Sequence, residues 1–255
     1  MDYLYSRNPK FTYENIITDC PYCSSKNIYN RITDLQTIES ISFKTVECNK
    51  CNLKFNINGD SIGEAYEYLI YDVYLIKEQK RYMYCILNLA QALELFLFYS
   101  IKTKLLFLPY KTRLINTQSD FNLISSLLSE NMEKYTFSHL RNIFFDLYIN
   151  QNSLQTIENV KQYLDKNSLN KVKSIDIQNW SSPINNIENQ RLRDLFCKLL
   201  NTKVPNLRNQ VVHKYSYRPS LSEVEKCISE TRDIVFRLRN HLQIKNHSFY
   251  INNRI

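Results

Sequence analysis

The segment "ILNLAQALELFLFYSI", residues 86–101, is the most apolar stretch of the sequence and decides the fold expected for most of the chain. Large apolar side chains recur at steps of three or four residues, at Tyr82, Ile86, Leu89, Leu93, Leu97 and Ile101. This is the period of an amphipathic helix with one buried face. We therefore predict a long core helix of a bundle that ends before Pro109. Asn88, Gln91 and Glu94 interrupt the apolar run, which argues against a membrane span.

Further helical patterns run from about residue 123 to residue 149, over residues 190–201 and over residues 220–244. A shorter helix is expected near residues 156–164, within a segment otherwise predicted to be loops. Glycine occurs only at Gly59 and Gly63, which excludes nucleotide folds built on glycine-rich loops. The change of pattern there places a domain boundary between residues 60 and 61, and Asp60 or Ser61 is expected to cap the first helix.

The sequence before this boundary contains two Cys-x-x-Cys pairs, "CPYC" and "CNKC". Each pair places two thiolates on a tight turn, so that four sulfurs can surround one tetrahedral zinc ion at about 2.3 Å. Two disulfides are the alternative, which the odd cysteine count of a cytoplasmic chain disfavours. Four cysteine ligands leave no open position for water, so we expect a structural metal. The predicted ligands are Cys20, Cys23, Cys48 and Cys51.

The residues between the two pairs are predicted to form a β-hairpin. Residues 27–35 and 40–48 alternate and carry β-branched side chains, and "KFNI" at residues 54–57 is expected to add a third strand. The region 15–58 resembles a zinc ribbon, a small fold that often binds nucleic acid or a protein. The other three cysteines, Cys85, Cys197 and Cys227, lie among apolar residues and are expected to be buried and unreactive.

The overall charge favours a polyanionic partner. Thirty-three Lys and Arg residues against twenty-five Asp and Glu residues give a formal net charge of +8. Such a balance favours nucleic acid as a partner. No signal peptide opens the sequence, so a soluble, cytoplasmic protein is expected.

The stretch "VPNLRNQVVHKYSYRP", residues 204–219, carries the residues best suited to catalysis. Pro205 fits the first turn of a helix, which places Arg208 near the helix N-terminus, where a phosphate is favoured. Asn209 and His213 share one helical face, and Arg208 and Tyr215 share a neighbouring stripe. These side chains suit metal-free cleavage of RNA, which needs a base, an acid and a cation on the phosphorane. Because one histidine cannot easily be both acid and base, two copies in a dimer are expected to form the site.

Other residues compete for such a role or could support it. Glu94 is either an edge residue facing water or a carboxylate that orients an Arg or His across the bundle. "SHLRNIFF" at residues 138–145 and "RLRNHL" at residues 237–242 also combine Arg, Asn and His. Spacing alone therefore leaves a solvated helix face as the alternative to a catalytic site.

In its context, "LRNQVVHKY" resembles the HEPN domain of prokaryotic toxin and antiphage ribonucleases. The family signature R-x-x-x-x-H, with a polar residue after the Arg, matches Arg208, Asn209 and His213. The likeness covers residues 192–242 and extends back to Tyr82. It implies a HEPN-like helical domain over residues 61–255 and a metal-independent endoribonuclease, with His213 as general base or acid, Arg208 as phosphate clamp and Asn209 as an orienting group. The implied products carry a 2′,3′-cyclic phosphate and a 5′-hydroxyl, and the implied site lies at a dimer interface.

The longer pattern R-x-x-x-x-H-x-Y resembles HEPN toxins paired with a nucleotidyltransferase antitoxin. In that subset the tyrosine is adenylylated, which implies that Tyr215 is a regulatory residue. Two other functions stay open: a non-catalytic module that binds nucleic acid or protein, and a DNA-binding regulator acting through the zinc ribbon. The first predicts RNA binding without cleavage, and the second predicts duplex binding with a steep salt dependence.

Overall fold

The structure is a computed structural model that describes residues 15–30, 34–35, 44–57, 65–132, 134–150, 156–166, 180–214 and 216–244. The chain divides into two compact units between Glu64 and Ala65. The predicted boundary residues, including Asp60 and Ser61, lie outside the described residues. A small β-unit is followed by a mainly helical unit, so the predicted fold class is confirmed.

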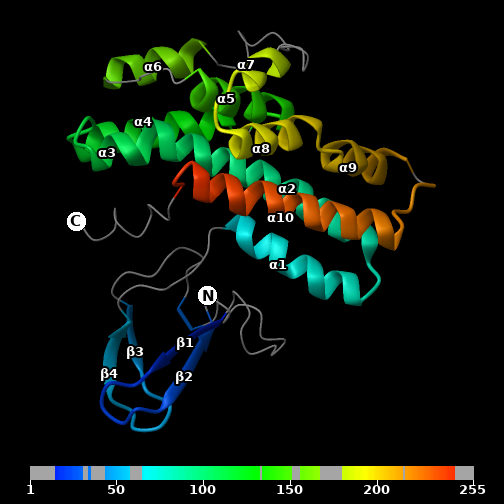
Figure 1. The fold of residues 1–255 in the computed structure, drawn as a ribbon. Coiled ribbons are helices and arrows are strands. Elements are labelled where there is room, and N and C mark those ends of the chain that lie inside the picture. Colours follow the sequence, from blue (N-terminus) through cyan, green and yellow to red (C-terminus); the bar gives the residue numbers. More distant parts are fainter. Residues whose placement is uncertain are drawn as a thin grey trace. The chain divides into compact units, whose positions relative to one another are not determined.

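The β-unit consists of two separate hairpins (Figure 1). Strand β1 (Asn15–Asp19) pairs with β2 (Lys26–Asn30), and β3 (Lys44–Glu47) pairs with β4 (Lys54–Ile57), both in antiparallel register. The strand at residues 54–57 is thus confirmed. The hairpin predicted between the two cysteine pairs is wrong, because β2 and β3 each pair across a cysteine turn instead. Those turns are much shorter than the segment joining β2 to β3, so they close at a lower entropic cost.

The hairpins share a small apolar core. Buried side chains come from all four strands, from the cysteine turns and from the segment between β2 and β3: Ile16, Cys20, Tyr29, Leu35, Val46, Cys48, Phe55 and Ile57. The Tyr29 hydroxyl donates a hydrogen bond of 2.8 Å to the backbone carbonyl of Glu47. This bond ties β2 to β3 although the two strands do not pair.

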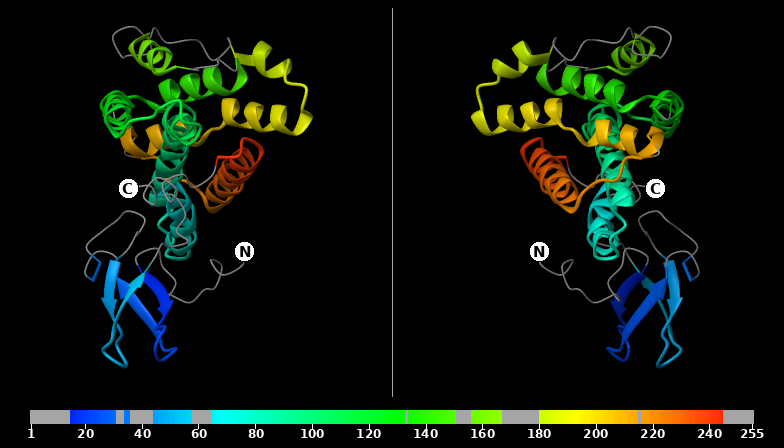
Figure 2. Two further views of the ribbon diagram at one scale, coloured as in Figure 1. Left: turned by 90° about the vertical axis from the view of Figure 1, so that its left-hand side faces the viewer. Right: turned by 90° about the vertical axis from the view of Figure 1, so that its right-hand side faces the viewer.

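The helical unit is a bundle built around α2 (Figures 1 and 2). Its elements are α1 (Ala65–Glu78), α2 (Tyr82–Lys102), the π-helical segment η3 (Thr103–Phe107), α3 (Leu108–Lys111), α4 (Gln118–Met132), α5 (Phe137–Ile149), α6 (Ile157–Lys166), α7 (Ser181–Asn185), α8 (Gln190–Asn201), α9 (Val204–His213) and α10 (Leu221–His241). Helix α2 packs against α1, α5, α9 and α10, and α10 also packs against α8.

Helix α2 fulfils the prediction of a core helix. The side chains of its predicted stripe are fully buried from Ile86 to Ile101, and the first of them, Tyr82, is half-buried. Its end is predicted wrongly, because the helix continues through η3 into α3, which contains Pro109. Proline cannot donate to the carbonyl four residues earlier and its ring clashes with that carbonyl, which favours a locally widened helix. Accordingly, the Leu108 amide bonds the carbonyl of Thr103, five residues back.

Among the described residues, one helical stretch, Tyr82–Tyr110, is long and apolar enough to cross a membrane by length and composition. However, 61% of its most apolar window is buried inside the structure. Such burial is typical of the core helix of a soluble protein.

The predicted helices over residues 190–201 and 220–244 correspond to α8 and α10. The region from residue 123 to residue 149 forms two helices, since Thr136 caps the N-terminus of α5 by accepting a bond from the His139 amide. Helix α7 lies where a loop was predicted. It is anchored by Trp180, whose Nε1 donates to Asn142 at 3.1 Å, and by the fully buried Ile184.

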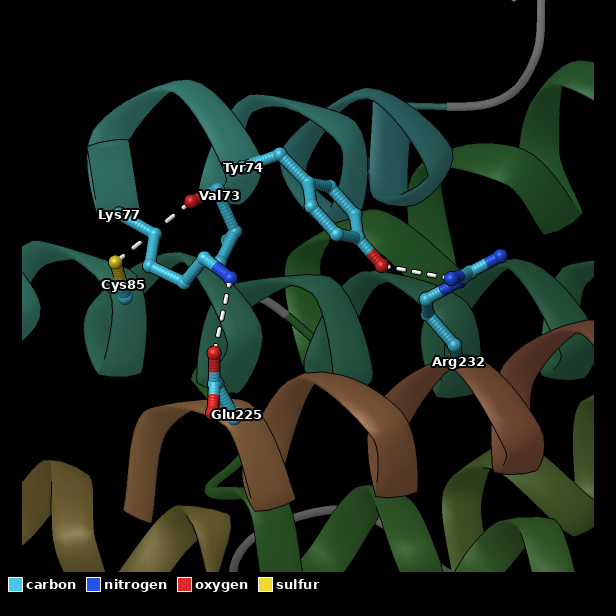
Figure 3. Close-up of polar contacts among 6 residues, drawn as sticks. All are labelled: Val73, Tyr74, Lys77, Cys85, Glu225 and Arg232. Carbon is cyan, nitrogen blue, oxygen red and sulfur yellow. Dashed lines mark hydrogen bonds and ion pairs between the residues drawn. The ribbon is translucent and has the colours of Figure 1, made fainter. Parts of the chain in front are cut away.

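Side-chain contacts join α1 to α2 and α10 (Figure 3). The Cys85 thiol of α2 donates to the Val73 carbonyl at 3.8 Å, and burial raises the pKa of this thiol. Lys77 pairs with Glu225 of α10 at 3.2 Å. Cys85 and Cys227 are buried and Cys197 is half-buried. The expected burial is therefore confirmed for Cys85 and Cys227 and is only partial for Cys197.

Candidate functional sites

The four predicted metal ligands come together in the β-unit. Their sulfur atoms all lie within 4.8 Å of one another, with 3.7 Å between Cys20 and Cys51 and 3.7 Å between Cys23 and Cys48. A tetrahedral ion with sulfur ligands at about 2.3 Å requires edges of about 3.8 Å. Disulfide bonds would require about 2.05 Å, and all four cysteines are free. The cluster can therefore hold a structural metal ion.

Each cysteine pair lies on a turn that aims backbone N–H groups at sulfur. In the first turn the Cys20 amide donates to the Ser25 carbonyl at 2.8 Å, and the Tyr22 amide lies 3.4 Å from the Cys20 sulfur. Ser24 has a φ of 55°, a left-handed conformation that short polar residues tolerate. The second turn repeats these features at Cys48, Lys50, Asn52 and Leu53.

The pKa values of Cys48 and Cys51 in the cluster are shifted in opposite directions. Hydrogen bonding from Ser25, supported by backbone amides, lowers the pKa of Cys48 to about 5. The Leu53 amide favours the thiolate of Cys51, but burial and the neighbouring cysteines outweigh it and raise the pKa of Cys51 to about 12. Four thiolates this close repel one another, and a bound metal ion supplies the positive charge that offsets this repulsion.

The predicted catalytic residues all lie on α9. Arg208, Asn209 and His213 are exposed, whereas Val204 and Val211 of the same helix are buried. The Arg208 guanidinium donates to the Asn209 side-chain oxygen at 3.2 Å. Pro205 lies in the first turn of the helix, as predicted. Three side chains of α9, a cation, an amide and an imidazole, are thus accessible to solvent.

Glu94 reaches this region from α2, against which α9 packs. It is half-buried, and desolvation raises the pKa of its carboxyl, while the positive charge of Arg208 partly opposes that shift. Glu94 therefore lies close enough to Arg208 for their charges to interact. Tyr215, the predicted regulatory residue, lies outside the described residues.

The Arg-Asn pair in α5, the first alternative to the pair in α9, is buried and hydrogen-bonded within the fold. Arg141 is 4% exposed, donates to the Leu200 carbonyl at 3.0 Å and lies 5.4 Å from the ring of Phe137. Its neighbour Asn142 is also buried and accepts the bond from Trp180. Arg141 thus supplies a positive charge at the C-terminal end of α8, where a helix dipole favours one.

The Arg-Asn pair in α10 is also partly engaged in contacts that stabilise the fold. Arg239 forms an ion pair of 2.5 Å with the buried Glu67 of α1. Asn240 and His241 are exposed. Of the Arg-Asn pairs in α5, α9 and α10, the pair in α9 has both members exposed together with a histidine one turn later.

Sequence reasoning missed Ser25 and Asn27, which contact the sulfur cluster. The Ser25 hydroxyl lies 3.0 Å from the Cys23 sulfur and 3.2 Å from the Cys48 sulfur. Its position two residues after a cysteine pair was a usable signal, because side chains there can turn back to the sulfurs. Asn27 gave a weaker signal, a polar residue at an inward position of a strand.

No family model, curated protein or solved structure matches this chain. Its function is therefore argued from the chemistry of two places: the four-cysteine cluster and the exposed face of α9.

Proposed function

We propose that the chain is a metal-independent endoribonuclease with a HEPN-like helical domain, acting in the cytoplasm as a toxin or antiphage defence effector. The observation that carries this proposal is the joint exposure of Arg208, Asn209 and His213 on one helix. In α5, by contrast, the equivalent residue types are buried or hydrogen-bonded within the fold. A net charge of +8 supports a polyanionic substrate.

In the proposed reaction the 2′-oxygen of RNA attacks the adjacent phosphorus and the bond to the 5′-oxygen breaks. A base accepts the 2′-hydroxyl proton and an acid protonates the leaving 5′-oxygen, which leaves a 2′,3′-cyclic phosphate and a 5′-hydroxyl. His213 is the residue of α9 whose imidazole can accept or donate a proton in this reaction. Arg208 stabilises the additional negative charge of the phosphorane, and Asn209 orients Arg208 through their hydrogen bond.

The metal of the β-unit is proposed to be zinc, in a zinc ribbon. Sulfur ligands favour zinc over harder cations. Four cysteines fill a tetrahedral coordination sphere and leave no position for a catalytic water. When bound, zinc supplies folding energy to the β-unit. In this proposal it has no part in RNA cleavage.

We expect the purified chain to be a dimer, because one His213 cannot supply base and acid at once. Val212 is 48% exposed between the proposed catalytic side chains, and an exposed apolar group there fits a contact with a second copy. Light scattering should give twice the chain mass of 30.5 kDa. Val212→Asp should give monomers that do not cut RNA. A wild-type monomer that cleaves RNA at the same rate at all concentrations would overturn the composite site.

The half-buried Glu94 predicts a pH dependence of stability. Burial raises the pKa of its carboxyl above the usual value of 4.5, so the folded chain binds this proton more tightly than the unfolded chain. The resulting stability is present below pH 4.5 and is lost as the pH rises through the raised value. Glu94→Gln should therefore raise the melting temperature at pH 7 more than at pH 4.5. An equal shift at both pH values would show that the pKa of Glu94 is not raised in the folded chain.

Regulation at Tyr215 is proposed from the R-x-x-x-x-H-x-Y pattern. Adenylylation would place a negatively charged phosphate and a nucleoside two residues after His213, where they would compete with the RNA phosphate for Arg208. Co-expression with a nucleotidyltransferase from the same genomic neighbourhood should add the mass of AMP and abolish cleavage. Tyr215→Phe should escape both effects, with Tyr217→Phe as the control. An adduct on another residue would contradict the assignment.

If the chain does not cut RNA, the two alternative functions remain: a non-catalytic binding module or a DNA-binding regulator. The β-unit offers little support for the regulator. Its described strands and turns carry four lysines, Lys26, Lys44, Lys50 and Lys54, against Asp19, Asp34 and Glu47. Four thiolates around a divalent ion add further negative charge. Electrostatic attraction of a DNA duplex to the described strands and turns would be weak.

A further inference from the structure

Asn27 is a buried polar residue in the small apolar core of the β-unit. It lies on β2 opposite Thr18 of β1, and 1% of its surface is exposed. Burying an amide without hydrogen bonds costs about 1 to 3 kcal/mol. A unit with so few core residues tolerates this residue only because its hydrogen bonds are made.

The Asn27 amide joins the two metal-binding turns. Its nitrogen donates to the Ser25 carbonyl, in the first turn, at 2.9 Å and lies 3.6 Å from the Cys48 sulfur, in the second turn. Its oxygen accepts a bond of 2.8 Å from the Asn49 amide, also in the second turn. One side chain therefore holds both turns at a fixed separation and aims a donor at a metal ligand.

The second hairpin shows that the turn itself does not require this residue. Asn27 and Phe55 occupy the same place, the second residue of the strand that follows each turn. Phe55 is buried and has no amide to offer, so the polar link runs only from the first hairpin to the second. The link ends on Cys48, which also receives bonds from the Ser25 hydroxyl and the Lys50 amide.

We propose that Asn27 is the positioning residue of the metal site, which pre-assembles the two cysteine turns and thereby sets the affinity for the ion. Hydrogen-bonding partners of metal ligands contribute about 10-fold to 100-fold in affinity. The inference rests on the proposed metal site and is independent of ribonuclease activity.

The test measures zinc affinity of the full-length chain by competition with a chromogenic chelator. Asn27→Leu removes both hydrogen-bonding functions and should weaken zinc binding about 10-fold to 100-fold. Asn27→Asp keeps an oxygen for the Asn49 amide but replaces the donor with negative charge beside Cys48. It should weaken binding at least as much, although its shape is nearly unchanged.

Asn56→Leu is the matched control, because Asn56 lies on β4 and its side chain bonds the exposed Thr45 hydroxyl at 2.8 Å. Its zinc affinity should equal that of the wild type. Wild-type affinity in Asn27→Asp would overturn the proposal, and this variant decides the matter if Asn27→Leu does not fold. A wild-type chain that binds no zinc would instead remove the metal assignment itself.

Discussion

His213→Ala is expected to lose most of the ribonuclease activity of this protein. General acid-base catalysis by a positioned side chain typically contributes about 10² to 10⁴ in rate. In a two-fold site the substitution removes the imidazole from both copies at once, so no second histidine remains on α9 to take over. The measurement is the single-turnover cleavage rate of a labelled single-stranded or loop-containing RNA.

The variant should remain folded, because the His213 side chain is exposed and its loss leaves no cavity in the core. Arg208→Ala, also at an exposed position, should lose a comparable amount through the unclamped phosphate. His241→Ala is the matched control, since His241 is exposed near the end of α10 and lies beside another Arg-Asn pair. His139→Ala is a second control, whose ring stacks on Tyr135. Both controls should cut RNA at the wild-type rate. If His213→Ala did so as well, α9 would not be the catalytic element.

Cys48→Ser is expected to unfold the β-unit while the helical unit stays folded. Structural zinc contributes about 10 to 16 kcal/mol of apparent binding free energy in small zinc domains. Cys48 is buried, and its thiolate is the one that Ser25, Asn27 and Lys50 stabilise by hydrogen bonds. Metal analysis should find one zinc per wild-type chain and none, or nearly none, in the variant. Hydrogen exchange should lose protection over strands β1 to β4 and keep it over α2 and α10.

Cys197→Ser provides the control for this experiment, because Cys197 is half-buried in α8 and far along the chain from the cluster. It should bind one zinc and keep the protection of both units. Wild-type protein purified without chelator that contains no zinc would contradict the assignment. So would a Cys48→Ser chain whose β-unit stays protected from exchange.

The local parts of the fold could be predicted from the sequence, and the long-range pairing could not. The period of apolar residues in α2 identified the core helix, and the spacing of the cysteines identified their cluster. Strand β2 could pair with β1 across a tight cysteine turn or with β3 across a long connection. The alternation of apolar and polar residues does not show which pairing is more stable. Likewise, Pro109 indicated a break, but a wide helical turn can accommodate a proline and α2 continues past it.

In the candidate site, too, local features could be predicted from the sequence and long-range contacts could not. Sequence spacing placed Asn209 and His213 on one face and Arg208 on a neighbouring stripe, and all three side chains are exposed in the structure. Spacing did not distinguish Arg208 from Arg141, because burial depends on which helices pack around each one. Asn27 was missed for a related reason, since its importance arises from contacts with a turn more than twenty residues later.

Metal-independent ribonuclease activity is tested most directly by incubating the purified wild-type chain with RNA in EDTA. The ends of the products are then identified. The zinc content of the same sample is measured in parallel. The proposed metal-independent mechanism predicts cleavage with 2′,3′-cyclic phosphate and 5′-hydroxyl ends, undiminished by the chelator. RNA that is bound but stays intact, or cleavage that requires magnesium and leaves 5′-phosphate ends, would contradict it.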